Sequence, residues 1–164
     1  MTAVTARHDE IINILYNELS SKKLIMNTNK CISYLPGTDV LDDLRPDIYI
    51  EDPVKKSIFI VDVKYPMEME ELYQNAVDRN IVKYTDLKGR IQLVKTGYTI
   101  SVHTIVIGSL GCVPALTESE LKRIRIATGR IRGLCKVLAA SCIRDSAKIW
   151  DFHKNSVLAE KQES

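Results

Sequence analysis

The chain has 164 residues, of which 45% are hydrophobic and 27% charged, as expected of one globular domain that folds without disulfide bonds. No apolar run approaches ~18 residues and the N-terminus lacks an apolar segment, so we expect no membrane span, no signal peptide and an intracellular location. The cysteines lack the paired spacing of a zinc ribbon, and the net charge of +2 excludes a protein that is basic throughout.

An amphipathic helix is expected first, over residues 4–21, because apolar side chains recur there at helical spacing. His8 belongs to the apolar stripe, and Glu10 and Glu18 lie beside it. Either glutamate taken singly is most simply a solvated carboxylate. Residues 30–35 form a candidate first strand, followed by a turn at residues 36–39.

Two strand-like runs follow, residues 44–51 and 58–66, and together they predict a hairpin. The second run is almost continuously apolar, which suits a central strand buried on both faces, yet it ends in Asp62 and Lys64. Side chains two apart in a strand share a face, so these two point the same way. Asp47 can bring a second carboxylate to them if the strands pair.

Two carboxylates and an ammonium group on adjoining strands suit a divalent-metal site. Mg²⁺ takes oxygen ligands, usually one or two carboxylates together with waters and substrate phosphate. A bound metal polarises phosphate and lowers the pKa of an attacking water, which a nearby lysine can position or deprotonate. The pattern therefore predicts phosphodiester hydrolysis. A surface hairpin with an Asp–Lys pair at its rim is the alternative that the spacing alone leaves open.

A long helical pattern over residues 68–95 comes next and stops before Gly97, with Lys83 beside the apolar stripe and Tyr84 within it. Residues 98–108 predict a further strand. A short helix to residue 127 and a longer one over residues 129–152 complete an α/β domain. We expect residues 1–154 to form this single domain and residues 155–164 to form a polar, disordered tail.

Positive charge is concentrated near the C-terminus. Residues 117–154 contain nine Lys or Arg and four Asp or Glu, a net charge of +5, which leaves −3 for the rest of the chain. This asymmetry predicts a phosphate-facing side, although a solvated amphipathic helix accounts for it equally well. The candidate DNA-binding cations of this segment are Arg130, Arg132, Lys136 and Arg144.

Four motifs occur in a characteristic order. They are Arg45-Pro-Asp47, Val61-Asp-Val-Lys-Tyr-Pro66, Lys83-Tyr84-x-x-Leu87 and Ile105-Val-Ile-Gly-Ser-Leu-Gly-x-Val113. This string resembles the restriction-like endonuclease domain, of the PD-(D/E)xK type, at the C-terminal end of R2 and R4 group non-LTR retrotransposon polyproteins. The resemblance runs from about Arg7 to about Trp150. It implies an α-β-β-β-α-β core with a mixed sheet, extended by two C-terminal helices.

The resemblance also assigns roles at the predicted site. It implies that Asp47 and Asp62 bind Mg²⁺ or Mn²⁺ and that Tyr84 supports the site. The catalytic lysine of these nucleases is frequently moved from the strand to the following helix. This chain keeps both Lys64 and Lys83, so which of them handles the water stays open.

The segment before the hairpin supplies further candidates by resemblance. A preceding helix often contributes one more acid in this fold, for which Glu18 is the first candidate and Glu10 the second. Arg7 and His8 lie where a zinc-knuckle-like motif ends in the related elements, and a role in positioning DNA or the active site follows for them. A partly buried helix histidine is the simpler alternative for His8.

The implied activity is nicking of double-stranded target DNA in the nucleus, which supplies a 3′-hydroxyl to prime reverse transcription. The implied partners are the reverse transcriptase and the rest of the polyprotein in cis, with the element RNA as a further candidate. Two alternatives are retained. One is a DNA-binding module that cuts little in isolation, and the other is a junction-resolving nuclease of the same fold, which would require a dimer.

Overall fold

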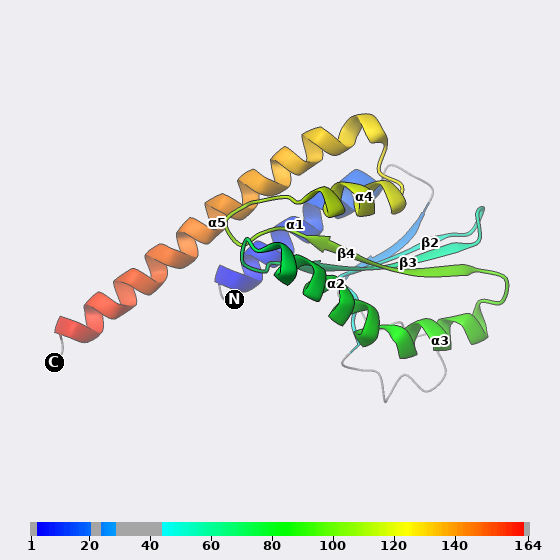
Figure 1. Ribbon diagram of the computed structural model, residues 1–164, viewed down its shortest axis with the longest axis horizontal. Coiled ribbons are helices and arrows are strands. Elements are labelled where there is room, and N and C mark those ends of the chain that lie inside the picture. The colour runs from blue at the N-terminus through cyan, green and yellow to red at the C-terminus, as the bar shows by residue number, and fades with distance from the viewer. Residues whose placement is uncertain (1–2, 21–23, 29–43, 163–164) are drawn as a thin grey trace.

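The computed structural model describes residues 3–20, 24–28 and 44–162. Over these residues the chain forms a four-stranded mixed sheet with helices on both faces (Figure 1). This confirms the expected α/β class. The elements are α1 (Ala3–Ser20), β1 (Ile25–Thr28), β2 (Ile48–Asp52), β3 (Ser57–Lys64), α2 (Glu70–Lys83), α3 (Thr85–Val94), β4 (Thr99–Val106), α4 (Ala115–Arg123) and α5 (Thr128–Gln162). None of the helices in the described parts of the chain is long and apolar enough to span a bilayer.

The sheet has the order β1-β2-β3-β4, and the predicted hairpin lies at its centre. β1, β2 and β3 pair antiparallel, whereas β4 pairs parallel to β3 after the crossover through α2 and α3. In the hairpin Ile48 is opposite Val61. Continuing this register by one residue brings Asp47 opposite Asp62, which is the pairing that the sequence suggested.

β3 is buried on both faces, and its side chains alternate between two cores. Phe59, Val61 and Val63 join the larger core with α1, α4 and α5, while Ile58 and Ile60 join the smaller core under α3. This explains why the strand reads as a nearly continuous apolar run. The alternation also places Asp62 on the side of α2 and α3.

The helix predicted over residues 68–95 is two helices that meet at Tyr84, whose backbone φ and ψ are −99° and 9°. On α2 the side chain of the buried Asn80 donates from Nδ2 to Thr104 Oγ1 of β4 at 2.9 Å, which fixes this helix against the strand. The buried stripe continues on α3 with Leu87 and Ile91. The break therefore lets two helical segments follow the twisted sheet instead of one straight cylinder leaving it.

The strand predicted at residues 30–35 and the turn at 36–39 lie outside the described residues, so both stay predictions. The first described strand is β1. One prediction differs from the structure at the C-terminal end of the domain. The tail predicted from residue 155 is helical as far as Gln162, because α5 continues through it (Figure 1). Residues 155–162 contain no Gly or Pro and include Leu, Ala, Glu, Lys and Gln, all of which are good helix formers.

Substitution of two glycines, one beside α5 and one within it, should change the free energy of unfolding in opposite directions. Gly111 has φ +98°, and a Cβ there would lie 2.4 Å from Ile143 Cγ1, so we expect Gly111→Ala to destabilise the fold by about 1–3 kcal/mol. Gly133 lies within α5 with no atom within 4 Å of an added Cβ, so Gly133→Ala should stabilise by about 0.5–1 kcal/mol. Urea denaturation measures both, and equal effects would contradict the backbone assignment at Gly111.

Candidate active site

Asp62 is the centre of a polar cluster at the end of β3, and only 1% of its surface is exposed. The Tyr84 hydroxyl donates to its Oδ1 at 2.7 Å, and Lys83 Nζ lies 3.6 Å from the same oxygen. Lys64 Nζ forms a direct ion pair with Oδ2, and no further donor in the described parts of the chain hydrogen-bonds to this buried oxygen. The charged groups that contact Asp62 among the described residues are therefore cations.

Asp47 is the second carboxylate, 8% exposed, and it is held from two sides. The Val63 backbone N–H donates to its Oδ2 at 2.6 Å, which fixes Asp47 across the hairpin next to Asp62. Its Oδ1 lies 3.0 Å from His8 Nε2 of α1. The hydrogen bond to Asp47 raises the pKa of His8 above its ordinary value, against the lowering effect of burial. Asp47 is thus both positioned and electrostatically paired.

Tyr84 connects three of the four sequence motifs. Its hydroxyl contacts Asp62, lies 3.1 Å from the Arg45 carbonyl oxygen and accepts from Lys83 Nζ at 2.9 Å. Burial, followed by the charge of Asp62, raises the pKa of Tyr84 well above its ordinary value. The phenol therefore stays neutral near physiological pH and acts as a hydrogen-bond donor to the carboxylate.

Both candidate lysines reach Asp62, from different elements. Lys64 comes from β3 and contacts Oδ2, whereas Lys83 comes from the end of α2 and approaches Oδ1. Each lysine side chain is 38% exposed, so each can also reach a ligand bound from the solvent side. The two lysines therefore approach different oxygens of the same carboxylate.

The structure does not place the predicted helix acid at this site. Glu18 instead binds Arg130 of α5 through two hydrogen bonds of 3.0 Å. It lies ten residues after His8, which is roughly 15 Å along the helix axis. Glu10, the second candidate, forms an ion pair with Arg144 at 3.5 Å. The side chain that α1 contributes to the carboxylates is the imidazole of His8.

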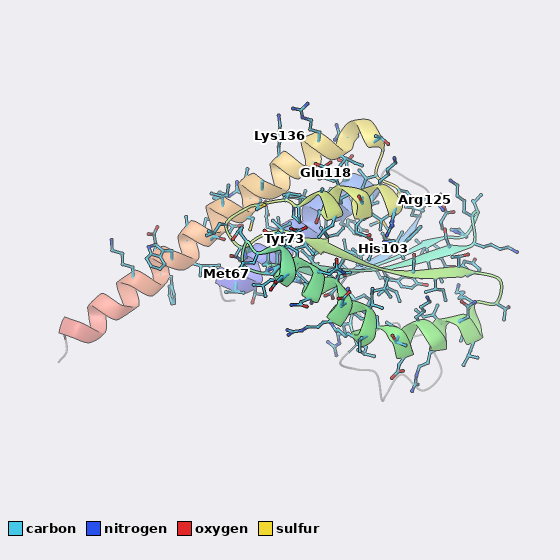
Figure 2. The ribbon with its side chains drawn as sticks, viewed as in Figure 1. Met67, Tyr73, His103, Glu118, Arg125 and Lys136 are labelled. Carbon is cyan, nitrogen blue, oxygen red and sulfur yellow. The ribbon has the colours of Figure 1, made fainter. Side chains whose placement is uncertain are left out.

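The predicted DNA-binding cations divide into two groups. Arg7, His8 and Arg144 lie at the site end of the α1–α5 pair, where Arg7 Nη1 donates to Ser146 Oγ at 3.0 Å. The other group is on the early turns of α5, roughly 12–21 Å from Arg144 along the helix. Its members are Arg130, Arg132 and Lys136, and Figure 2 shows Lys136 pointing away from the sheet.

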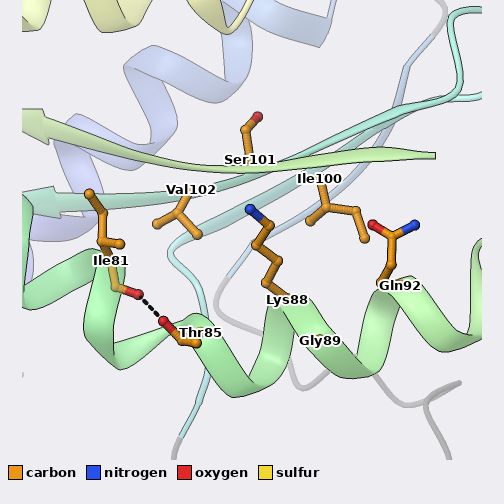
Figure 3. A pocket seen from close by; sticks show the side chains of 8 residues that line it. All are labelled: Ile81, Thr85, Lys88, Gly89, Gln92, Ile100, Ser101 and Val102. Carbon is orange, nitrogen blue, oxygen red and sulfur yellow. Dashed lines mark hydrogen bonds between the residues drawn. The ribbon is translucent and has the colours of Figure 1, made fainter.

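A second polar cluster and a groove lie elsewhere on β4. His103 is buried, with Nδ1 2.6 Å from Glu120 Oε2 of α4 and Nε2 2.7 Å from Ser101 Oγ. The groove runs between α3 and the start of β4. The side chains of Lys88 and Gln92 on α3 point toward β4, and the side chain of Ser101 on β4 points away from α3 (Figure 3). None of the candidate site residues lines this groove, which is therefore separate from the cluster around Asp62.

The carboxylates of Asp47 and Asp62 can be compared with the ligands that a divalent cation takes in proteins. Within residues 3–20, 24–28 and 44–162, no three His, Cys, Asp or Glu side chains are grouped closely enough to hold a metal ion. Mg²⁺, however, is commonly bound by one or two carboxylates and completes its shell with water and phosphate. Asp62 Oδ2 is a buried acceptor whose partner among the described residues is the Lys64 ammonium group, and Asp47 is fixed beside Asp62. The donor set therefore fits a hard cation with solvent-supplied ligands.

The Tyr84 contact predicts a specific stability loss. Tyr84→Phe removes a hydrogen bond to a buried carboxylate, so we expect a loss of about 1.5–3 kcal/mol in the free energy of unfolding. Tyr73→Phe is the matched control, because that hydroxyl is also buried but has no carboxylate acceptor. Equal urea midpoints for the two variants would contradict the role assigned to Tyr84.

Four segments distant in sequence thus meet at one end of the sheet: the start of α1, the residues before β2, the end of β3 and the junction of α2 with α3. The contacts of His8 and of the Arg45 carbonyl were missed from the sequence, because no spacing pattern reports a contact between segments 39 residues apart. Comparison with models of known protein families and with curated proteins gives no match to this chain.

Proposed function

We propose that this chain is a metal-dependent DNA endonuclease of the PD-(D/E)xK type. The observation that carries the proposal is the convergence of Lys64, Lys83 and Tyr84 on the buried Asp62, with Asp47 fixed beside it. The order of one helix, three antiparallel strands, the α2–α3 crossover and a parallel strand supports it, because this is the order that the resemblance implies.

In this proposal Asp47 and Asp62 hold Mg²⁺ or Mn²⁺. A cation bound there would polarise the scissile phosphate and lower the pKa of the attacking water. Lys64 would orient the attacking water as an ammonium group or, as the neutral amine, take up its proton, since its Nζ lies at Asp62 Oδ2. Lys83 stabilises charge on the phosphate, and Tyr84 holds Asp62 in place.

The proposed reaction is hydrolysis of one strand of double-stranded DNA. The water oxygen forms a bond to phosphorus and the bond to the 3′ oxygen breaks, which leaves a 3′-hydroxyl and a 5′-phosphate. As part of the same proposal, the 3′-hydroxyl primes reverse transcription in the nucleus by the polyprotein that carries this domain. The element RNA is a further partner in that scheme.

Nicking of supercoiled plasmid in Mg²⁺, Mn²⁺ or EDTA tests the activity. We expect open-circular product only with metal, and extension of the nick by a polymerase without prior end repair. Product formation in EDTA, or a 3′-phosphate at the nick, would contradict the proposed chemistry.

One observation favours a DNA-binding module as the second candidate. Two ammonium groups already offset the charge of Asp62, so the carboxylate is compensated in the absence of metal. A module of this kind would bind DNA with the same affinity in EDTA, lose affinity steeply with salt and produce no nick. Gel-shift and nicking assays on the same preparation separate the two functions.

A further inference from the structure

An open apolar groove lies beside the candidate active site, between α5 and the segments that follow β3 and β4. Its lining includes Arg7, Met67, Leu110, Ile143 and Trp150. The last four are strongly exposed, with Trp150 at 70% and Leu110 at 67%. Met67, labelled in Figure 2, lies just before α2 at this end of the molecule. Such a concentration of exposed apolar side chains is typical of a binding surface.

Arg7 joins this groove to the candidate active site. It directly precedes His8, which contacts Asp47, and its guanidinium lies 4.4 Å from the centre of the Tyr65 ring. Tyr65 in turn follows Lys64. Arg7 also lines the groove, where its Nη1 donates to Ser146 Oγ at 3.0 Å. Arg7 therefore lies between the groove and the pair of carboxylates that His8 contacts.

The far end of the groove is a flat aromatic surface flanked by cations. Trp150 lines the groove from α5, whose C-terminal half extends beyond the sheet (Figure 1). Lys148 and Arg144 on the same helix have side chains 65% and 58% exposed, and they form ion pairs with Asp145 at 2.7 Å and with Glu10 at 3.5 Å. An aromatic platform with nearby cations is what proteins use to bind single-stranded nucleic acid, because each base has a face that stacks and each phosphate a charge.

We propose that this groove binds an unpaired stretch of the DNA strand that passes through the active site, with a base stacked on Trp150 and a phosphate on Arg7. The inference rests on the proposed endonuclease function, because it names the strand that would leave that site. A protein surface could also cover apolar side chains. Arg7 lies at the end of the groove that is nearest the predicted phosphodiester chemistry, and its positive charge favours a nucleic acid over a protein as the ligand.

Trp150 is the one tryptophan of the chain, so tryptophan emission, excited at a wavelength that the tyrosines do not absorb, reports on this groove. Asp62→Asn protein in EDTA is titrated with a short oligothymidylate, a blunt duplex and the same duplex with a single-stranded overhang. We expect saturable quenching by the oligothymidylate and the overhang duplex, weakened by salt, and none by the blunt duplex. Quenching by the blunt duplex alone, or by none of the three, would overturn the inference.

Variants give a second readout through the anisotropy of a labelled oligothymidylate. Trp150→Ala should weaken binding about 5-fold to 100-fold, and Arg7→Gln should weaken it and reduce its salt dependence. Arg123→Gln on α4 is the matched control and should bind like the parent protein. Parent-like binding by Trp150→Ala would overturn the inference. So would a change in tryptophan emission with protein concentration alone, because a second copy would then cover the groove.

The outcomes separate this inference from the endonuclease proposal. Metal-dependent nicking by a protein whose tryptophan does not respond to single strands defeats the groove assignment and leaves the nuclease standing. Quenching by single strands without any nicking supports the groove and defeats the nuclease.

Discussion

Asp62→Asn is expected to reduce metal-dependent plasmid nicking by a factor of about 10³ or more, since several kcal/mol of charge stabilisation depend on the bound metal. The substitution keeps the size of the side chain and an oxygen that can accept from Tyr84, but removes the charge that attracts a cation. Asp62 is 1% exposed and is the carboxylate that both Lys64 and Lys83 contact. Its loss therefore removes the negative charge at the centre of the cluster.

The control for this variant is Asp78→Asn, the same change on the exposed face of α2, where Asp78 accepts from Gln74 at 2.9 Å. It should nick like the parent protein. Circular dichroism and the urea midpoint establish that Asp62→Asn is folded. Parent-like nicking by a folded Asp62→Asn protein would place the catalytic site elsewhere.

The second large effect distinguishes the two lysines. Lys64→Ala should reduce nicking by a factor of about 10²–10⁴, the range for loss of a general acid or base. Lys83→Ala should cost about 10-fold to 100-fold, because its shortest described contact is the Tyr84 hydroxyl, and a lost charge-assisted hydrogen bond is worth about 1.5–3 kcal/mol. The single-turnover nicking rate is the measurement.

Lys88→Ala, a change of an exposed lysine on α3 outside the site, serves as the control for both variants. The combined Lys64→Ala, Lys83→Ala protein shows whether the lysines act together, since neighbours on one carboxylate should not give additive effects. A larger loss in Lys83→Ala than in Lys64→Ala would reverse the two assignments and make the helix lysine the one nearer the water.

The centre of the fold was predictable because its signals are local. The apolar run of β3, the turn before it and the alternation of side chains predict the hairpin, and the same alternation brings Asp47, Asp62 and Lys64 to one end of it. The Lys83–Tyr84 pair has no comparable local signal. Only the resemblance indicated it, and the structure brings both residues to Asp62.

The contribution of α1 could not be predicted in the same way. Its apolar stripe indicates which face is buried, but the axial position of the helix over the sheet depends on packing against α5. That packing pairs Glu18 with Arg130, 112 residues away, and leaves His8 as the α1 residue that contacts Asp47. The split at Tyr84 was missed for a related reason, since a continuous stripe does not report the twist of the sheet beneath it.

Manganese binding tests the proposed site most directly, because it does not depend on turnover. Electron paramagnetic resonance measures free Mn²⁺ during titration of the parent protein, Asp62→Asn and Asp78→Asn. We expect the parent protein and Asp78→Asn to bind Mn²⁺ saturably, with competition by Mg²⁺, and we expect this binding to be lost in Asp62→Asn. Undiminished uptake by a folded Asp62→Asn protein, or no uptake by the parent, would contradict a metal site at Asp47 and Asp62.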